Sequence, residues 1–167
     1  MRKDAHYIVP VLLVISALLL SSLIPGGPIE NRDFSRIDPS ILLSFNIFLT
    51  ILGLGSFILA IYTLKMHRWA YLLAFVAGMS YFTVYAIDLY EIFPKSPTEM
   101  SATLLAVEMT GAIVALPLIY CSYTGLFEKE QTEDQIPVIK QNRWGIVTIL
   151  VLGTGIILFS TYSAMNP

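Results

Sequence analysis

The chain has 167 residues, of which 56% are hydrophobic and 13% are charged, and its mean hydropathy is +0.71. A soluble domain carries about 25% charged residues, so this composition leaves too little polar surface to cover a water-soluble globule. The net charge of −2 lacks the basic excess of a nucleic-acid-binding face, and we expect no nucleic-acid partner. The single cysteine, Cys121, excludes an intramolecular disulfide and a cysteine-based zinc site.

Long apolar segments follow one another along the chain and predict an all-α, polytopic membrane helix bundle. A helix needs about 20 mostly apolar residues to cross the hydrocarbon core of a bilayer. Helices are expected because backbone groups have no water partners in lipid, and no alternating pattern indicates a barrel. We predict a single transmembrane domain over residues 1–167 with about five spans, at 7–24, 41–62, 69–93, 101–123 and 144–162.

The first apolar segment is open to two interpretations. A basic start followed by an apolar stretch also describes a secretory signal peptide. The stretch up to Ile24 is long for that role, and no clear A-x-A cleavage site follows it. We therefore interpret it as a retained anchor, although the loop after it lies outside in either case.

Basic residues in alternate loops predict the orientation of the bundle, because cytoplasmic loops are enriched in Lys and Arg. Five spans place seven basic residues on one side and three on the other, so the N-terminus is predicted inside and the C-terminus outside. The first group is Arg2, Lys3, Lys65, Arg68, Lys129, Lys140 and Arg143, and the second is Arg32, Arg36 and Lys95.

The outer loop at 25–40 is rich in proline and glycine, which excludes a regular helix there. Its end, Asp38-Pro39-Ser40, has the composition of a helix start, with Asp38 or Ser40 as the N-cap.

Three acidic residues, Asp88, Glu91 and Glu108, lie inside predicted spans. Ionisable side chains within a span are costly and mark a functional site by default. At about 1.5 Å per residue, Asp88 lies roughly 7–8 Å from the outer end of its helix, and Glu108 roughly 10 Å from the outer end of its own. Adjacent antiparallel helices could therefore bring the two carboxylates together, and Asn46 falls at a similar depth.

Helical spacing groups these residues on faces that could share one interior. The faces are Gly78, Tyr81, Tyr85 and Asp88 in the third helix, Glu108, Gly111, Ala112 and Ala115 in the fourth, and Asn46, Thr50 and Gly53 in the second. Gly111-x-x-x-Ala115 is a small-xxx-small pattern, which lets another helix approach closely. We therefore predict helix packing at Gly111 and Ala115, and a polar cluster near the outer mouth of the bundle.

Two hypotheses account for this polar cluster. In the first, the cluster binds a proton, a cation or a small polar ligand, because two neighbouring carboxylates readily share a proton. The candidate binding residues are Asp88, Glu108, Glu91, Asn46, Tyr85 and Tyr81. In the second, Arg32 or Arg36 pairs with Asp88 or Glu108 and fixes the outer loop to the bundle. This hypothesis is favoured because the two arginines lie in the outer loop, within reach of the acids.

The sequence offers no catalytic or metal-binding set. Both histidines, His6 and His67, fall at the predicted inner edge, far from the acids, which leaves no Ser-His-Asp arrangement and no histidine inside the bundle for haem. A zinc site at these two histidines would lack further ligands. We therefore expect no catalytic residue, no metal and no cofactor.

Three functions fit these features. The leading hypothesis is a non-enzymatic accessory or assembly subunit of a larger membrane complex, since the features are mainly those of helix packing. The second is a proton- or cation-coupled transporter or channel component that uses Asp88 and Glu108 and forms a homo-oligomer, since five helices alone make a narrow bundle. The third is a membrane enzyme acting on a lipid, sterol or quinone, with Asp88, Glu108 and Tyr85 as acid–base groups. All three place the chain in a membrane as a multi-pass protein in contact with lipid.

Overall fold

The chain is all helical in the computed structural model, which describes residues 5–127 and 143–165. Its five helices are α1 (Ala5–Ser22), α2 (Pro39–Leu64), α3 (Arg68–Leu89), α4 (Ala102–Gly125) and α5 (Arg143–Met165). The all-α class and the five predicted helices are thus confirmed. Of the residues used to predict the orientation, Arg2, Lys3, Lys129 and Lys140 lie outside the described residues.

Three of the helices, α2, α3 and α4, are long and apolar enough to cross a membrane. The other two contain shorter apolar stretches, at Tyr7–Ser22 and Val151–Met165. The coarse prediction of long apolar helices therefore holds for three of the five predicted spans.

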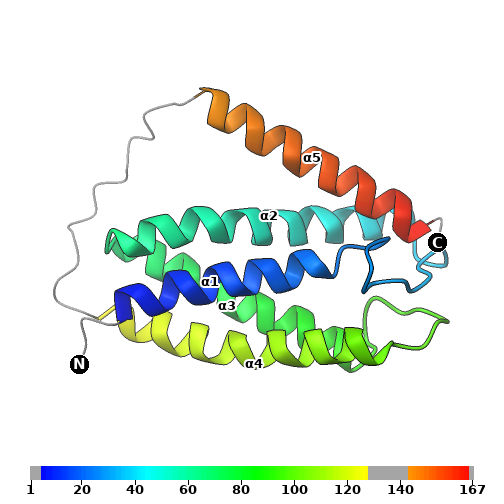
Figure 1. Cartoon of the computed structure of the whole chain (residues 1–167), viewed down its shortest axis with the longest axis horizontal. Helices are drawn as coiled ribbons and strands as arrows, with labels where there is room; N and C mark the ends of the chain where they lie inside the picture. The colour runs from blue at the N-terminus through cyan, green and yellow to red at the C-terminus, as the bar shows by residue number, and fades with distance from the viewer. Residues whose placement is uncertain (1–4, 128–142, 166–167) are drawn as a thin grey trace.

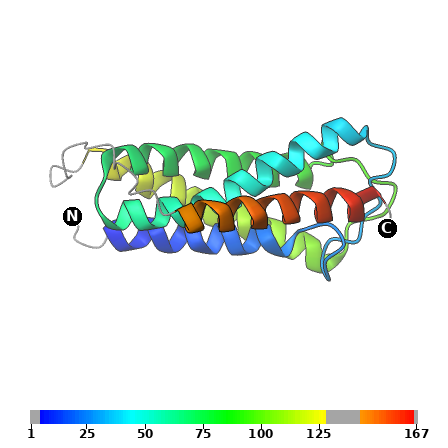
Figure 2. The same ribbon diagram turned by 90° about the horizontal axis from the view of Figure 1, so that it is seen from above.

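The helices α1 to α4 form a bundle, and α5 lies along one side of it (Figure 1). Helix α3 packs most extensively on α4, and α1 packs on both α2 and α4. Within the described part of the chain, α2 is the one helix on which α5 packs. The C-terminal end of α5 lies near the α1–α2 and α3–α4 loops (Figures 1 and 2), whereas its N-terminal end lies away from the bundle (Figure 1).

The bundle exposes large apolar side chains, and its interior holds polar side chains beside an apolar core. Ser16, Ser56, Thr63 and Ser122 are buried inside it. On the outside, large apolar side chains such as Ile51 (66% exposed) and Ile113 (63% exposed) have little cover from the rest of the chain. Such an apolar outer surface is the reverse of that of a water-soluble bundle, whose polar face is turned outward.

Glycines let aromatic rings approach the neighbouring helix closely. A Cβ atom on Gly111 of α4 would overlap the ring of Tyr85 from α3, and one on Gly125 would overlap the ring of Tyr71. Ala115, one turn from Gly111, is fully buried. Gly111 of the predicted small-residue face therefore lies at the contact between α3 and α4.

Helix α3 ends earlier than predicted for an identifiable reason. Helix α3 ends at Leu89 rather than at the predicted Phe93. Glu91 adopts a left-handed conformation (φ 52°) and its backbone N–H donates to the Asp88 carbonyl, while Ile92 N–H donates to the Ile87 carbonyl. These two bonds form a Schellman motif, which terminates a helix. The prediction that Glu91 lies inside a helix is therefore wrong. Glu91 lies in the loop that follows α3, where it is exposed.

The starts of α2 and α4 follow the expected capping rules. Ser40 N–H donates to the Asp38 carboxylate at 2.8 Å, and Pro39 occupies the first turn of α2. Asp38, rather than Ser40, is therefore the N-cap of α2. Leu104 N–H donates to Ser101 Oγ at 3.1 Å at the start of α4. In both cases a side-chain oxygen accepts from a backbone N–H that has no partner within the helix.

Candidate ionic site at one end of the bundle

Arg32 in the α1–α2 loop lies at the centre of an ionic site. Its Nη1 and Nη2 atoms donate to the two carboxylate oxygens of Asp88, at 2.7 and 2.8 Å. Its Nε and Nη2 atoms also donate to Glu30, at 3.0 and 2.7 Å. Paired bonds of this kind fix the guanidinium plane and are among the stronger hydrogen bonds in proteins. Arg32 therefore joins the loop to the last turn of α3.

Burial of the ionic site changes the acid–base behaviour of the arginine. The side chains of Arg32 and Glu30 are only 6% and 5% exposed. Burial alone lowers the pKa of Arg32, but the hydrogen bonds and charges of Asp88 and Glu30 outweigh it and raise that pKa above its usual value. Arg32 thus stays positively charged at any physiological pH, and the ring of Phe34 lies beside its guanidinium, 5.3 Å from ring centroid to Cζ.

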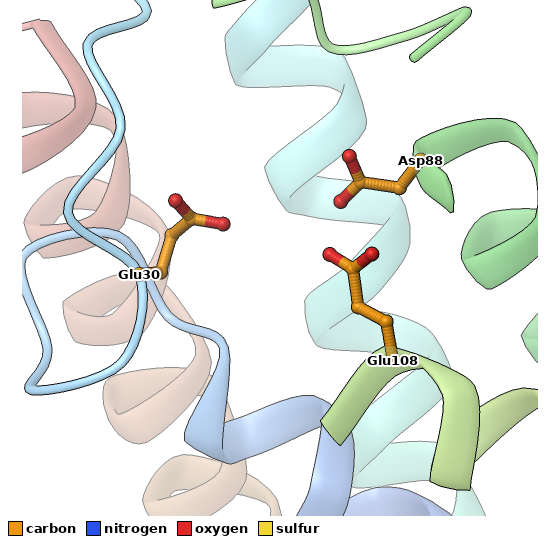
Figure 3. Close-up of side chains that lie close together, drawn as sticks. All are labelled: Glu30, Asp88 and Glu108. Atoms are coloured by element: carbon orange, nitrogen blue, oxygen red, sulfur yellow. The ribbon is translucent and has the colours of Figure 1, made fainter. Parts of the chain in front are cut away.

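Glu108 is the third carboxylate of the site and differs from the other two. Its side chain is 0% exposed, and the nearest Arg32 nitrogen, Nη2, lies 3.6 Å from Oε1. Neither of its carboxylate oxygens has a hydrogen-bond partner among the described residues. Figure 3 shows the Glu108 carboxylate pointing toward that of Asp88, with Glu30 facing both from the loop.

The three carboxylates lie close enough together to ligate a single ion, since one oxygen from each lies within 4.8 Å of the others. Arg32 weakens that possibility, because its guanidinium already occupies oxygens of Glu30 and Asp88 and repels a second cation. If all three acids were ionised, three negative charges against one positive charge would leave −2 in a buried site. Binding of one proton would lower this buried net charge to −1.

Two pockets adjoin the ionic site. The larger has a volume of about 220 Å³ and is lined by Arg32, Glu91, Lys95 and neighbouring residues of the α3–α4 loop. The smaller, of about 50 Å³, is mostly apolar and is lined in part by Glu30, Arg32, Asp88, Tyr85 and Asn46. A volume of 50 Å³ can hold a few water molecules, so water can reach the Arg32 side of the site.

The structure brings together some of the residues predicted for this site and separates others. Asp88, Glu108 and Arg32 meet, and Tyr85 lines the smaller pocket with its hydroxyl buried and without a hydrogen-bond partner among the described residues. Arg36 is exposed and lies near Asp33 of its own loop, not beside Asp88 or Glu108. Arg32, and not Arg36, is therefore the arginine that pairs with Asp88 and Glu108 among the described residues.

Tyr81 and Asn46 face the interior as predicted, but their hydrogen bonds are to residues outside the ionic site. The Tyr81 hydroxyl lies 2.9 Å from Ser56 Oγ and 3.3 Å from the Leu52 carbonyl oxygen of α2. Asn46 donates from Nδ2 to Thr161 Oγ1 of α5 at 3.0 Å. Tyr81 therefore joins α3 to α2, and Asn46 joins α2 to α5, because each has a nearer polar partner than the acids.

Glu30 belongs to the site, although the sequence did not single it out. It lies in a loop of prolines and glycines, where no helical spacing indicates which way a side chain points. The one local signal is its position two residues before Arg32, since the Arg32 backbone N–H also donates to the Glu30 carboxylate at 3.1 Å.

The loop that carries Glu30 and Arg32 is also attached to α5. Phe34 N–H donates to the Ala164 carbonyl at 3.2 Å. Phe34, Leu42 and Ala164 form a small buried apolar cluster at the same place. Gly26, in the same loop, has a φ of +80°, and a Cβ there would overlap the side chain of Ser163. The ionic site is thus covered by a loop that α3, α4 and α5 all contact.

A family model described as "Domain of unknown function (DUF8051)" matches residues 5–137. The chain belongs to this family. The DUF8051 match contains α1 to α4 and every residue of the ionic site, and it ends before α5 begins. No curated protein and no solved structure matches the chain.

Proposed function

We propose that this chain is a multi-pass integral membrane protein that acts as a non-enzymatic accessory or assembly subunit of a larger membrane complex. In this proposal all five helices span the membrane, with the N-terminus inside and the C-terminus outside. The observation that carries it is the outer surface of the bundle, on which many large apolar side chains are exposed. Lipid or the apolar helices of partners are the surroundings that such a surface requires.

The position of α5 supports an assembly role. It packs on α2 alone among the described helices, and Val151, Leu158 and Phe159 on it are each more than half exposed. It also lies beyond the part of the chain that matches the family. A helix with this much free apolar surface has room for a partner helix as well as for lipid.

The ionic site supports a structural role for its charged residues. Glu30 and Asp88 are each bound by Arg32, which leaves little of their hydrogen-bonding capacity free for a substrate. An accessory subunit needs such a fixed loop, because partners recognise a rigid surface with less loss of conformational entropy.

Purification from the native membrane in mild detergent, followed by mass spectrometry, tests the proposed function. We expect a larger membrane protein to co-purify in stoichiometric amount, and its yield to fall when Val151 and Leu158 of α5 are both replaced by tryptophan. Replacement of Leu72 and Leu73 on α3 is the matched control, since these side chains are also exposed. A chain that always purifies alone, or as a homo-oligomer, would overturn the accessory role.

The proposed orientation is testable by labelling with a membrane-impermeant maleimide. After Cys121 is replaced by serine, a cysteine at Thr98 in the α3–α4 loop should react in intact cells. A cysteine at Lys65, in the α2–α3 loop, should react only after the cells are permeabilised. Both positions are exposed, so steric access is matched. Equal labelling of both sites in intact cells, or the reverse pattern, would show that the orientation is wrong.

A proton- or cation-coupled transporter component is the second candidate, and one observation favours it. The ionic site has more acidic than basic groups and lies beside a polar pocket of about 220 Å³. Transport in reconstituted vesicles that Glu108→Gln abolishes, in a variant that still folds and inserts, would favour this candidate over the accessory role.

A further inference from the structure

We propose that Glu108 and Asp88 form a proton-binding carboxyl pair, in which Glu108 carries the proton and donates it to Asp88 while Asp88 stays ionised against Arg32. This inference concerns the chemistry of the ionic site and does not depend on whether the chain is an accessory subunit. It assigns the proton, rather than a metal ion, as the ligand of the site.

The first observation is the isolation of Glu108. Its side chain is fully buried, and both carboxylate oxygens lack a hydrogen-bond partner among the described residues. An ionised carboxylate in that position would lose its hydration without gaining a donor, which is among the most costly arrangements in a protein. A protonated carboxyl group avoids this cost, because it is neutral and can itself donate a hydrogen bond.

The second observation is that Arg32 forms its hydrogen bonds with Asp88 and Glu30 rather than with Glu108. Its Nη1 and Nη2 atoms donate to both oxygens of Asp88, and Nε and Nη2 donate to Glu30. The 3.6 Å between Nη2 and Glu108 Oε1 is too long for a hydrogen bond. Arg32 is therefore hydrogen-bonded to Asp88 and Glu30, whereas Glu108 has only a longer ion pair with this shared arginine and no hydrogen bond to it.

Among the described residues, no cation other than Arg32 forms an ion pair with Glu108. Tyr85 and Tyr81 on α3 are neutral phenols, and the loop contributes only Glu30 beside Arg32. Helices α1 and α2 have no titratable residue in the half of each that adjoins the site, and the titratable residues of α4 other than Glu108 lie at its opposite end. The carboxylate of Asp88, toward which Glu108 points in Figure 3, is the natural acceptor of its proton.

The proton has a route to solvent through Asp88. The Asp88 side chain is 15% exposed, whereas that of Glu108 is not exposed at all. Asp88 and Arg32 line the smaller pocket together, and Arg32 also lines the larger polar pocket with Glu91 and Lys95. Water on the loop side can therefore exchange a proton with the pair by way of Asp88.

Infrared spectroscopy of the purified full chain, in lipid at neutral pH, tests the proposal. The wild-type protein should show the C=O stretching band of a protonated carboxylic acid, and Glu108→Gln should remove that band. Glu99→Gln, at an exposed glutamate in the α3–α4 loop, is the matched control and should leave the band in place. A spectrum without the band in the wild type, or a band that persists in Glu108→Gln, would overturn the proposal.

Folding of the variants provides an independent test. Glutamine has the shape of a protonated glutamic acid and can donate to Asp88, so Glu108→Gln should fold and keep the thermal midpoint close to that of the wild type. The folded wild-type chain binds one more proton than the unfolded chain, so its midpoint should fall as the pH rises and that proton leaves, while the midpoint of Glu108→Gln should not. Failure of Glu108→Gln to fold would contradict the proposal, because a neutral side chain of the same shape should be tolerated at this position.

Discussion

Replacing Arg32 with methionine should lower the free energy of unfolding by about 3–5 kcal/mol, as expected when one partner of a buried ion pair is removed. The variant leaves Glu30 and Asp88 buried without their shared counter-ion, next to Glu108. Like charges at this distance repel, and neither acid has another cationic partner among the described residues. The change can be measured by reversible unfolding in mixed micelles of detergent and lipid.

Arg36→Met is the matched control for the Arg32 variant. Arg36 lies in the same loop and carries the same charge, but it is exposed. Surface ion pairs contribute about 0–1 kcal/mol, so this control should behave almost as the wild type. If the two variants were equally stable, the ionic site would not hold the loop to the bundle.

Gly111→Ala should lower the free energy of unfolding by about 1–3 kcal/mol, the usual effect of adding a methyl group to a well-packed core. The added Cβ would overlap the ring of Tyr85, which is 1% exposed and has little room to move. Since Tyr85 precedes Asp88 by one helical turn on the same face, any shift of its ring also disturbs the ionic site.

Gly55→Ala provides the control for Gly111→Ala. An added Cβ on Gly55, also inside a helix, would meet no other atom within 4 Å. Alanine favours a helix over glycine by about 1 kcal/mol, so Gly55→Ala should be neutral or stabilising. Adding Tyr85→Leu to Gly111→Ala should recover part of the lost stability, and a loss that is the same with and without Tyr85 would rule out the overlap as the cause.

The helices could be predicted from the sequence because hydrophobicity and capping act locally. The length of the apolar segments predicted all five helices, and Asp38 and Ser101 lie at the starts of α2 and α4 as capping rules require. The end of α3 was misplaced, because the apolar pattern continues through Ile92 and Phe93 after the backbone has turned at Glu91. Glutamate seldom adopts the left-handed conformation, so the residue type at position 91 did not indicate that the helix ends there.

The candidate site could be predicted only where helical spacing constrains the direction in which a side chain points. Asp88 and Glu108 were placed together because each lies at a similar distance from the loop that joins α3 to α4, Asp88 near the end of α3 and Glu108 near the start of α4. Glu30 lies in an irregular loop, and nothing in its spacing shows that it turns inward to Arg32. Tyr81 faces the interior as predicted, yet Ser56 of α2 is its partner, because spacing within one helix does not reveal which neighbour lies opposite.

A double-mutant cycle between Arg32 and Asp88 tests most directly the central claim that the ionic site joins the loop to the bundle. The free energy of unfolding is measured for the wild type, Arg32→Met, Asp88→Leu and the double variant. Residues in direct contact show coupling energies of about 0.5–3 kcal/mol, so the double variant should be more stable than the sum of the two single effects predicts. Additive effects would mean that Arg32 and Asp88 do not interact in the folded protein, and that the loop is held to α3 by other contacts.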